Sequence, residues 1–307
     1  MSRPLRSVLI GDVDHYPSEY AFGVNQAMTM AGHWHTSVNI RLDMGAIAKR
    51  VREMQPDIIW GHMLLWAPGD HYKTPDLLDL CAAWRKRGTR VLLHDGDART
   101  DTRCPMDVST AIDLALCNHR APRTVWHIPQ LHWPYFCFWQ EARVEPVPEF
   151  QCDLAFAGRL DGSGIYQHRT ELVLQLKDKL GDRMKIFPGG DQHTVFRTPE
   201  VAASAKAVLG YGRPGRNGWL DVRVFQYPGA GAILLHDDVG EMLKPHAHYI
   251  PYESGSVDAI LAALDLVTSM SDKAQHDFRW LAFSYTQAMH SASARVKQAL
   301  EAVGLHA

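Results

Sequence analysis

Short apolar runs alternate with stretches of helical spacing along most of this chain. In the first half, compact apolar runs predict strands, and apolar residues spaced three or four apart between them predict helices. The strands expected there are 7–10, 36–40, 57–61, 90–94, 111–117 and 125–128. The helices expected there run from Ser18 to Gly32, along 47–54 and from Leu77 to Gly88. Strands that alternate with helices predict right-handed βαβ units and a parallel sheet.

The same alternation restarts in the second half. Strands are expected at 153–157, 184–187, 206–209 and 232–235, and helices at 169–180, at 257–267 and from Ser271 to the end. The segment GEMLKPHAHYIPYE (240–253) also has a helix-like pattern. The pattern as a whole predicts a second α/β unit followed by a helical tail.

A break in the middle of the chain divides these two halves. The stretch WQEARVEPVPE (139–149) is rich in proline and glutamate, which is typical of a linker. We therefore expect a first domain at 1–140, a linker at 141–151, a second domain at 152–285 and a terminal helix at 286–307 that packs back toward the first domain.

The fold class predicts where a ligand binds. In open parallel sheets, ligands bind in the loops outside the carboxyl ends of the strands, so two such sheets favour a site in a cleft between them. The loops expected to contribute are 11–18, 61–73, 94–107, 158–168, 188–198, 210–219 and 236–241.

Composition narrows the class of protein. The 307 residues are 46% hydrophobic and 21% charged, with a formal net charge of −2, so no strong overall field favours nucleic acid. The 5 cysteines form no C-x-x-C pair, which disfavours a disulfide framework or a zinc ribbon. No apolar run approaches the ~18 residues of a membrane span, and the first residues lack a signal peptide. These observations predict a soluble, cytoplasmic protein with no membrane span.

Several short motifs have a functional and a structural interpretation. GYGRPG (210–215) matches the dinucleotide fingerprint G-x-G-x-x-G through Gly210, Gly212 and Gly215, with Tyr211 and Arg213 at its variable positions, although such fingerprints normally open the first βαβ unit. The D-x-D strings at 12–14 and 95–97 could hold a divalent cation, but helix caps and loop hydrogen bonds explain them more simply, so no metal site is assigned.

Carboxylates and an imidazole after two predicted strands are candidates for proton transfer. Asp14 and His15 follow the first strand, and Asp95 follows the fourth. A carboxylate beside an imidazole suits a general base, while a loop contact is the structural alternative. Neither a G-x-S-x-G elbow nor a phosphate-binding G-x-x-x-x-G-K-[ST] loop occurs, which disfavours serine hydrolases and P-loop nucleotidases.

Glycine and arginine concentrate after strands of the second half. Gly158 and Arg159 close the strand at 153–157, and the segment DVRVFQYPGAGAILL (221–235) contains Arg223, Gly229 and Gly231. Glycines let backbone N–H groups approach a diphosphate, and arginine can clamp its oxygens in a bidentate manner. Tight packing of strand against helix is the alternative role for the glycines.

These segments resemble a known family. The second half is similar to the C-terminal domain of GT-B glycosyltransferases, specifically the group 1 branch related to the spore-maturation protein CgeB. The segments that carry the resemblance are DLAFAGRL (153–160), YQHRTELVLQL (166–176), DVRVFQYPGAGAILLHDD (221–238), HYIPYESGSVDAILAAL (248–264) and HSASARVKQAL (290–300). The first half fits more loosely through VLLHDGDAR (91–99), IDLALCNHRAP (112–122) and HIPQLHWPYF (127–136).

The resemblance implies two Rossmann-like domains with parallel sheets facing a central cleft, the acceptor on the first and a nucleotide-sugar donor on the second. It implies that Arg159 neutralises the donor diphosphate with help from Arg169 or Arg213, and that the turn from Gly229 to Gly231 faces the phosphates. The donor-binding set that follows from it is Gly158, Arg159, Arg169, Gly210, Tyr211, Arg213, Arg223, Gln226, Gly229 and Gly231.

Two positions depart from the family pattern. Related retaining transferases carry a glutamate that binds the donor ribose where this chain has Gln226, and another where Gly218 stands. An amide still donates and accepts hydrogen bonds, but the acidic pair is missing. The retaining mechanism and the identity of the nucleotide therefore stay open, with a UDP-sugar favoured.

The resulting hypothesis is a metal-independent GT-B glycosyltransferase, a hexosyl- or pentosyltransferase without a cofactor, that uses a nucleoside diphosphate sugar as co-substrate. Asp14, His15 and Asp95 are the candidates for the catalytic base. The candidate acceptors are hydroxymethylated pyrimidines in DNA (the acceptors of related phage enzymes), polysaccharides and small molecules. An NAD-type oxidoreductase using the loop 210–215, or a non-catalytic ligand-binding protein of the same shape, are the alternatives.

Overall fold

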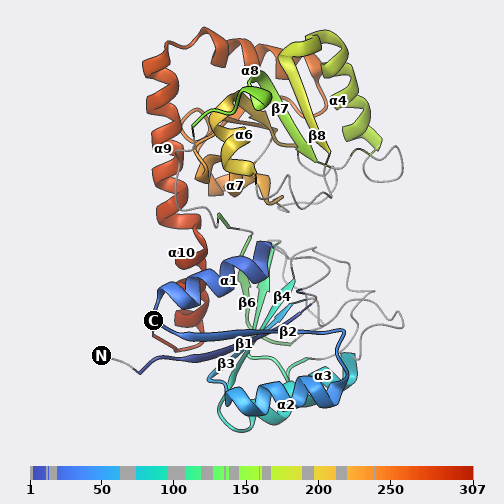
Figure 1. The fold of residues 1–307 in the computed structure, drawn as a ribbon, viewed down its shortest axis with the longest axis vertical. Coiled ribbons are helices and arrows are strands. Elements are labelled where there is room, and N and C mark those ends of the chain that lie inside the picture. Colours follow the sequence, from blue (N-terminus) through green and yellow to red (C-terminus); the bar gives the residue numbers. More distant parts are fainter. Residues whose placement is uncertain are drawn as a thin grey trace. The chain divides into compact units, whose positions relative to one another are not determined.

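The chain forms two compact units in a computed structural model, each with its own parallel sheet (Figure 1). The first unit consists mainly of Met1–Phe138 and Ala292–Ala307, and the second mainly of Trp139–Arg216 and Leu220–Ser291. The structure describes residues 3–11, 13, 19–62, 74–95, 108–118, 127–134, 136–137, 145–158, 160, 167–188, 197–211, 220–237 and 239–306.

The sheet of the first unit has six parallel strands in the order β2-β1-β3-β4-β5-β6. Its elements are β1 (Arg6–Gly11), α1 (Glu19–Met30), β2 (Trp34–Asn39), α2 (Met44–Met54), β3 (Ile58–His62), α3 (Thr74–Arg85), β4 (Arg90–Asp95), β5 (Leu114–Cys117), β6 (Gln130–His132) and the last helix α10 (Ala292–Ala302). Helices cover both faces of this sheet, so the inner strands β1, β3, β4 and β5 are largely buried, whereas the edge strands β2 and β6 are more polar and partly exposed.

Alternate strand residues sort between those two faces. Val8, Ile59 and Val91 join the core beneath α2 and α3. The intervening residues point to the other face, where α1 packs against α10. The indole of Trp133 donates a 2.9 Å hydrogen bond to the carbonyl oxygen of Arg295, which fastens α10 to the end of β6.

The sheet of the second unit has five parallel strands in the order β11-β10-β9-β7-β8. Its elements are β7 (Cys152–Gly158), α4 (Gln167–Leu180), β8 (Met184–Pro188), α6 (Thr198–Ser204), β9 (Ala205–Leu209), α7 (Arg223–Gly229), β10 (Leu234–His236), β11 (Ile250–Pro251), α8 (Val257–Ser269) and α9 (Asp272–His290), with short 3-10 turns at Pro148–Phe150, Gly181–Arg183 and Gly240–Met242. One apolar core lies beneath α4 and α8 and another beneath α6 and α7.

Side-chain caps explain where several helices begin. The carboxylate of Asp43 accepts from the Ala46 N–H at the start of α2, at 2.9 Å. The hydroxyl of Ser256 accepts from the Ala259 N–H at the start of α8, and that of Ser271 accepts from the Ala274 N–H at the start of α9. Each cap satisfies one N–H group that the helix itself cannot pair.

Most of the expected strands and helices are present, but two expectations were wrong. Of the strand expected at 125–128, residues 125 and 126 lie outside the described residues, and 127 and 128 form no strand, because the backbone of His127 has a φ of 49°; β6 begins at Gln130 instead. The helix expected at 240–253 is a 3-10 turn followed by β11. Pro245 and Pro251 lack the N–H that a helix needs, and His246 has a φ of 57°.

Two further differences concern one additional helix and one domain boundary. The helix α6 was not expected, because its seven residues are too short for a clear period. The domain boundary expected at 285 falls inside α9, since the chain passes from the second unit to the first after Ser291. No helix among the described residues is long and apolar enough to cross a membrane.

Candidate functional site

Charged side chains gather at the carboxyl edge of the second unit's sheet. Asp221 and Arg223 stand at the start of α7 and form an ion pair of 2.7 Å. Asp221 also accepts from the backbone N–H of Arg223 at 2.7 Å, so it pairs the first N–H group of α7 and orients the arginine at the same time. The Arg223 Nε donates to the carbonyl oxygen of Ala157, at 2.6 Å, which holds the guanidinium at the end of β7.

A second arginine lies at the same strand end. Arg169, in the first turn of α4, is only 7% exposed. Its guanidinium lies 5.9 Å from the centre of the Phe156 ring, and that of Arg223 lies 5.7 Å from the same centre. Two positive charges therefore meet around one aromatic ring where β7 ends.

Two tyrosines and a carboxylate extend this cluster. Burial and the nearby Asp237 raise the pKa of Tyr211, while the positive charge of Arg169 acts in the opposite direction. The Tyr252 hydroxyl donates to the Gly210 carbonyl oxygen at 2.6 Å, and burial raises its pKa well above the ordinary value, with Asp237, Tyr211 and Asp221 contributing. Both tyrosines are therefore neutral near pH 7.

The glycines at these strand ends are needed for close packing. A Cβ atom at Gly158 would lie 2.6 Å from Arg223 Nη2, and one at Gly210 would lie 2.4 Å from His236 Cδ2. The glycines thus let the arginine and the histidine approach the backbone, which agrees with the packing alternative. Their contact with phosphate stays a prediction.

Gly229 and Gly231 do not belong to this edge. Gly229 ends α7, and Gly231 precedes β10, so both lie at the amino edge of the sheet. The Gly229 carbonyl oxygen accepts from Gln287, and that of Gly231 accepts from Arg279, both on α9. The expectation that this turn faces the phosphates is corrected, because α7 runs antiparallel to the strands and carries the turn away from their carboxyl ends.

Gln226 lies in the middle of α7 and is 4% exposed. Such burial favours a neutral amide over a carboxylate, because an ion loses its hydration there. The structure thus gives a local reason for glutamine at this position, and its contact with a donor ribose stays a prediction.

The first unit has an aromatic stack at the carboxyl edge of its own sheet. The Nδ1 atoms of His62 and His94 are 3.1 Å apart, so one donates a hydrogen to the other. The ring of Tyr20 stacks on both, 4.0 Å from His94 and 4.8 Å from His62. Burial, with a contribution from His62, holds the pKa of His94 well below its ordinary value, so this imidazole is neutral.

Asp95 follows His94 at the end of β4 and is half-buried. Successive strand residues point to opposite faces, so the carboxylate of Asp95 does not join the stack of Tyr20 and His94. The sequence analysis missed that stack because its members come from three separate elements. The available signal was that His62 and His94 both lie at the ends of apolar strands.

The other predicted site residues cannot be placed. Asp14, His15, Arg159 and Arg213 lie outside the described residues. In the part of the chain that the structure describes, no group of three or more His, Cys, Asp or Glu side chains is arranged to hold a metal ion.

Comparison with known proteins supports the fold. No family model matches the chain, and no curated protein matches its sequence. Among solved structures, a glycosyltransferase from Rickettsia africae superposes with a TM-score of 0.59 at 10% identity, covering 98% of each chain. HepE of Anabaena, solved with UDP-glucose, has a TM-score of 0.59 at 11% identity, over 97% of this chain and 99% of HepE.

A third structure is a DNA-modifying β-glucosyltransferase solved with and without its substrate uridine diphosphoglucose. It has a TM-score of 0.60 at 11% identity and covers 97% of this chain and 99% of its own. With two parallel sheets interleaved with helices, the chain has the GT-B fold, as the sequence predicted. Membership of the CgeB-related branch stays a prediction.

Proposed function

We propose that the chain is a glycosyltransferase that moves a sugar from a nucleoside diphosphate sugar to an acceptor hydroxyl. The observation that carries the proposal is the pair of guanidinium groups of Arg169 and Arg223 at the carboxyl edge of the second unit's sheet. It is joined by the similarity of the fold to glycosyltransferase structures over nearly the whole chain. We favour a UDP-sugar, because two similar structures were solved with UDP-glucose.

The second unit would bind the donor. As the bond between the sugar and the diphosphate breaks, negative charge grows on the leaving phosphate oxygens. Arg169 and Arg223 supply positive charge at this edge, and Arg159, which directly follows β7, would add a third guanidinium. These groups stabilise the departing diphosphate without a metal ion, so we expect activity to survive EDTA. A loss that Mn²⁺ restores would contradict this assignment.

The first unit would bind the acceptor. The acceptor oxygen forms the new bond to the sugar and must lose its proton to a base. Asp14 and His15, after β1, and Asp95, at the end of β4, are the groups we propose for that step in an inverting reaction. His94 is neutral at pH 7, so no positive charge on its imidazole lowers the basicity of a carboxylate nearby.

For the acceptor we propose testing hydroxymethylated DNA first, because one similar structure is a DNA-modifying enzyme. A polysaccharide and a panel of small alcohols are the other arms. The net charge of −2 provides no general attraction for DNA, so binding would depend on a local patch.

The experiment is a donor-hydrolysis screen with UDP-, GDP-, dTDP- and ADP-sugars in the absence of acceptor. Arg159→Ala should lower the rate by about 10²–10³, as the removal of one preorganised electrostatic group does. Arg50→Gln, which changes an exposed arginine on α2, is the matched control and should leave the rate unchanged. No turnover of any donor would favour a non-catalytic binding protein, and enhanced NADH fluorescence would favour an oxidoreductase.

A further inference from the structure

One face of α9 borders a pocket of about 430 Å³ that lies within the second unit. The helix residues that line it recur at three- and four-residue spacing from Asp272 to Phe283, so they share one face. Ala203 and Gly231 form part of the opposite wall, and they precede β9 and β10. The pocket therefore lies at the amino edge of the sheet, away from the cluster around Arg169 and Arg223.

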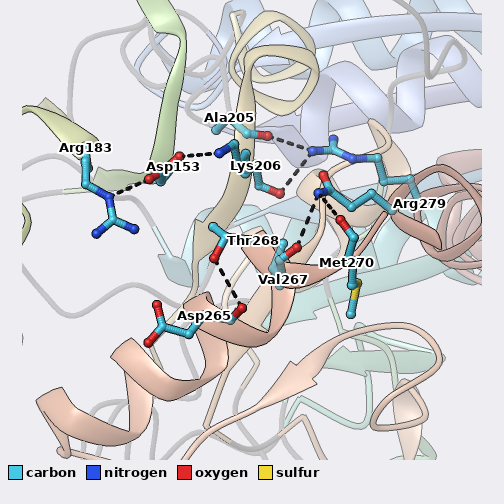
Figure 2. A network of polar contacts seen from close by, with 10 residues as sticks. Asp153, Arg183, Ala205, Lys206, Asp265, Val267, Thr268, Met270 and Arg279 are labelled. Carbon is cyan, nitrogen blue, oxygen red and sulfur yellow. Dashed lines mark hydrogen bonds and ion pairs between the residues drawn. The ribbon is translucent and has the colours of Figure 1, made fainter. Parts of the chain in front are cut away.

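Arg279 closes one side of this pocket. Its Nη1 donates to the carbonyl oxygens of Ala202 and Gly231, at 2.8 and 2.9 Å. Its Nη2 donates to those of Ala205 and Lys206, at 2.8 and 3.0 Å, as Figure 2 shows. The guanidinium is thus engaged by four backbone groups and acts as a rigid part of the wall.

An aromatic pair forms another wall. Trp280 is 54% exposed, so a large apolar ring of α9 is open to solvent where it lines the pocket. The ring of Phe283 lies 5.7 Å from that of Trp280, tilted by 33°. A tryptophan that lines a concavity while half exposed offers an apolar face to a ligand.

The rim of the pocket carries acidic and polar groups. Glu145 and Asp272 are exposed carboxylates on it, and His276 on α9 also lines it. Carboxylates accept hydrogen bonds from hydroxyl groups and repel phosphates. An aromatic face beside such acceptors suits a sugar ring, which has an apolar C–H face and a rim of hydroxyl donors.

We propose that this pocket is a second saccharide-binding site, separate from the donor site, which takes one or two neutral sugar units against Trp280. Its volume is within the range of about 300–1,000 Å³ that is usual for small-molecule pockets. The proposal does not depend on glycosyl transfer, because the site would bind saccharide with no nucleotide present.

The test is saturation-transfer NMR and calorimetry with maltotriose, cellotriose and chitotriose, on the full chain without donor. We expect at least one of them to bind, and Trp280→Ala to weaken its affinity about tenfold, equal to about 1.4 kcal/mol. Trp280→Phe should retain most of the affinity. Leu281→Ala is the matched control, since Leu281 is the next residue on α9, is 50% exposed and does not line the pocket.

Several results would overturn the proposal. One is that none of the three sugars binds the wild-type protein. Another is that Leu281→Ala loses as much affinity as Trp280→Ala, or that excess UDP displaces the sugar, which would place binding at the donor site. A single-stranded oligonucleotide that binds and is lost with Trp280→Ala, while sugars do not bind, would assign the pocket to nucleic acid instead. Thermal unfolding of each variant is measured as a control, and a Tm equal to that of the wild type shows that the fold is intact.

Discussion

Replacing Arg279 with methionine should destabilise the second unit strongly, although the residue is on the surface helix α9. The four carbonyl oxygens that its guanidinium binds come from the end of α6, the start of β9 and the turn before β10. Ala202 is among the last residues of α6, whose final carbonyl groups have no partner within the helix. Arg279 therefore joins three elements that meet at the amino edge of the sheet.

The expected loss follows from two opposing contributions. Hydrogen bonds from a charged donor contribute about 1.5–3 kcal/mol each, so four would total about 6–12 kcal/mol if they were independent. Burial lowers the pKa of Arg279, which shows that the site desolvates the charge, and methionine regains part of the apolar contact. We therefore expect a net loss of about 3–5 kcal/mol, similar to that of removing one partner from a buried ionic group.

The assay is urea and thermal unfolding followed by circular dichroism. For a unit of this size the loss corresponds to a fall in Tm of about 6–20 °C. Arg279→Lys should recover only part of it, because one ammonium cannot occupy both Nη positions. Lys273→Met, on the same helix, removes only an exposed pair with Asp277 and should cost less than about 1 kcal/mol. Equal losses in Arg279→Met and Lys273→Met, or no loss in either, would refute the reasoning.

Three further predictions concern packing, pH and the buried amide. Gly23→Ala should destabilise the first unit in urea by about 1–3 kcal/mol, since its Cβ would lie 2.1 Å from Phe136, and a more stable variant would contradict this. Burial alone would raise the pKa of Asp153, but Lys206 and Arg183 outweigh it and hold the pKa below 3.8 (Figure 2). The ionised Asp153 thus stabilises the fold above pH 3.8, and this contribution is lost as the pH falls further and the carboxylate is protonated. The difference in unfolding free energy between the wild type and Asp153→Asn should therefore shrink in acid titrations, and a constant difference would contradict this prediction. Gln226→Glu should lower Tm at pH 7 by burying a carboxylate, and an unchanged Tm with tighter donor binding would show that the side chain faces the ribose.

The repeating order of strands and helices was determined by the sequence alone. Apolar runs at 7–10 and 90–94 mark strands buried on both faces, and the spacing along 257–267 marks an amphipathic helix. Local periodicity is enough there, because each element must bury its own apolar residues. The parallel order and the carboxyl-edge location of Arg169 and Arg223 follow from that alternation.

Local pattern was misleading where single residues or distant contacts decide the structure. Pro245 and the positive φ of His246 end a pattern that otherwise reads as helical. The turn at Gly231 has the composition of a phosphate loop, yet the direction of α7 carries it to the opposite edge of the sheet.

Only the tertiary structure brings together residues that the chain separates. Tyr20, His62 and His94 stack because α1, β3 and β4 meet at one sheet edge, and none of the three carries a local signal of the others. Arg279 and the carbonyl oxygen of Ala202 likewise meet only after α9 docks on its unit. Periodicity depends on neighbours within one turn or one strand, whereas these contacts depend on which elements pack together, and that is decided by burial of the whole core.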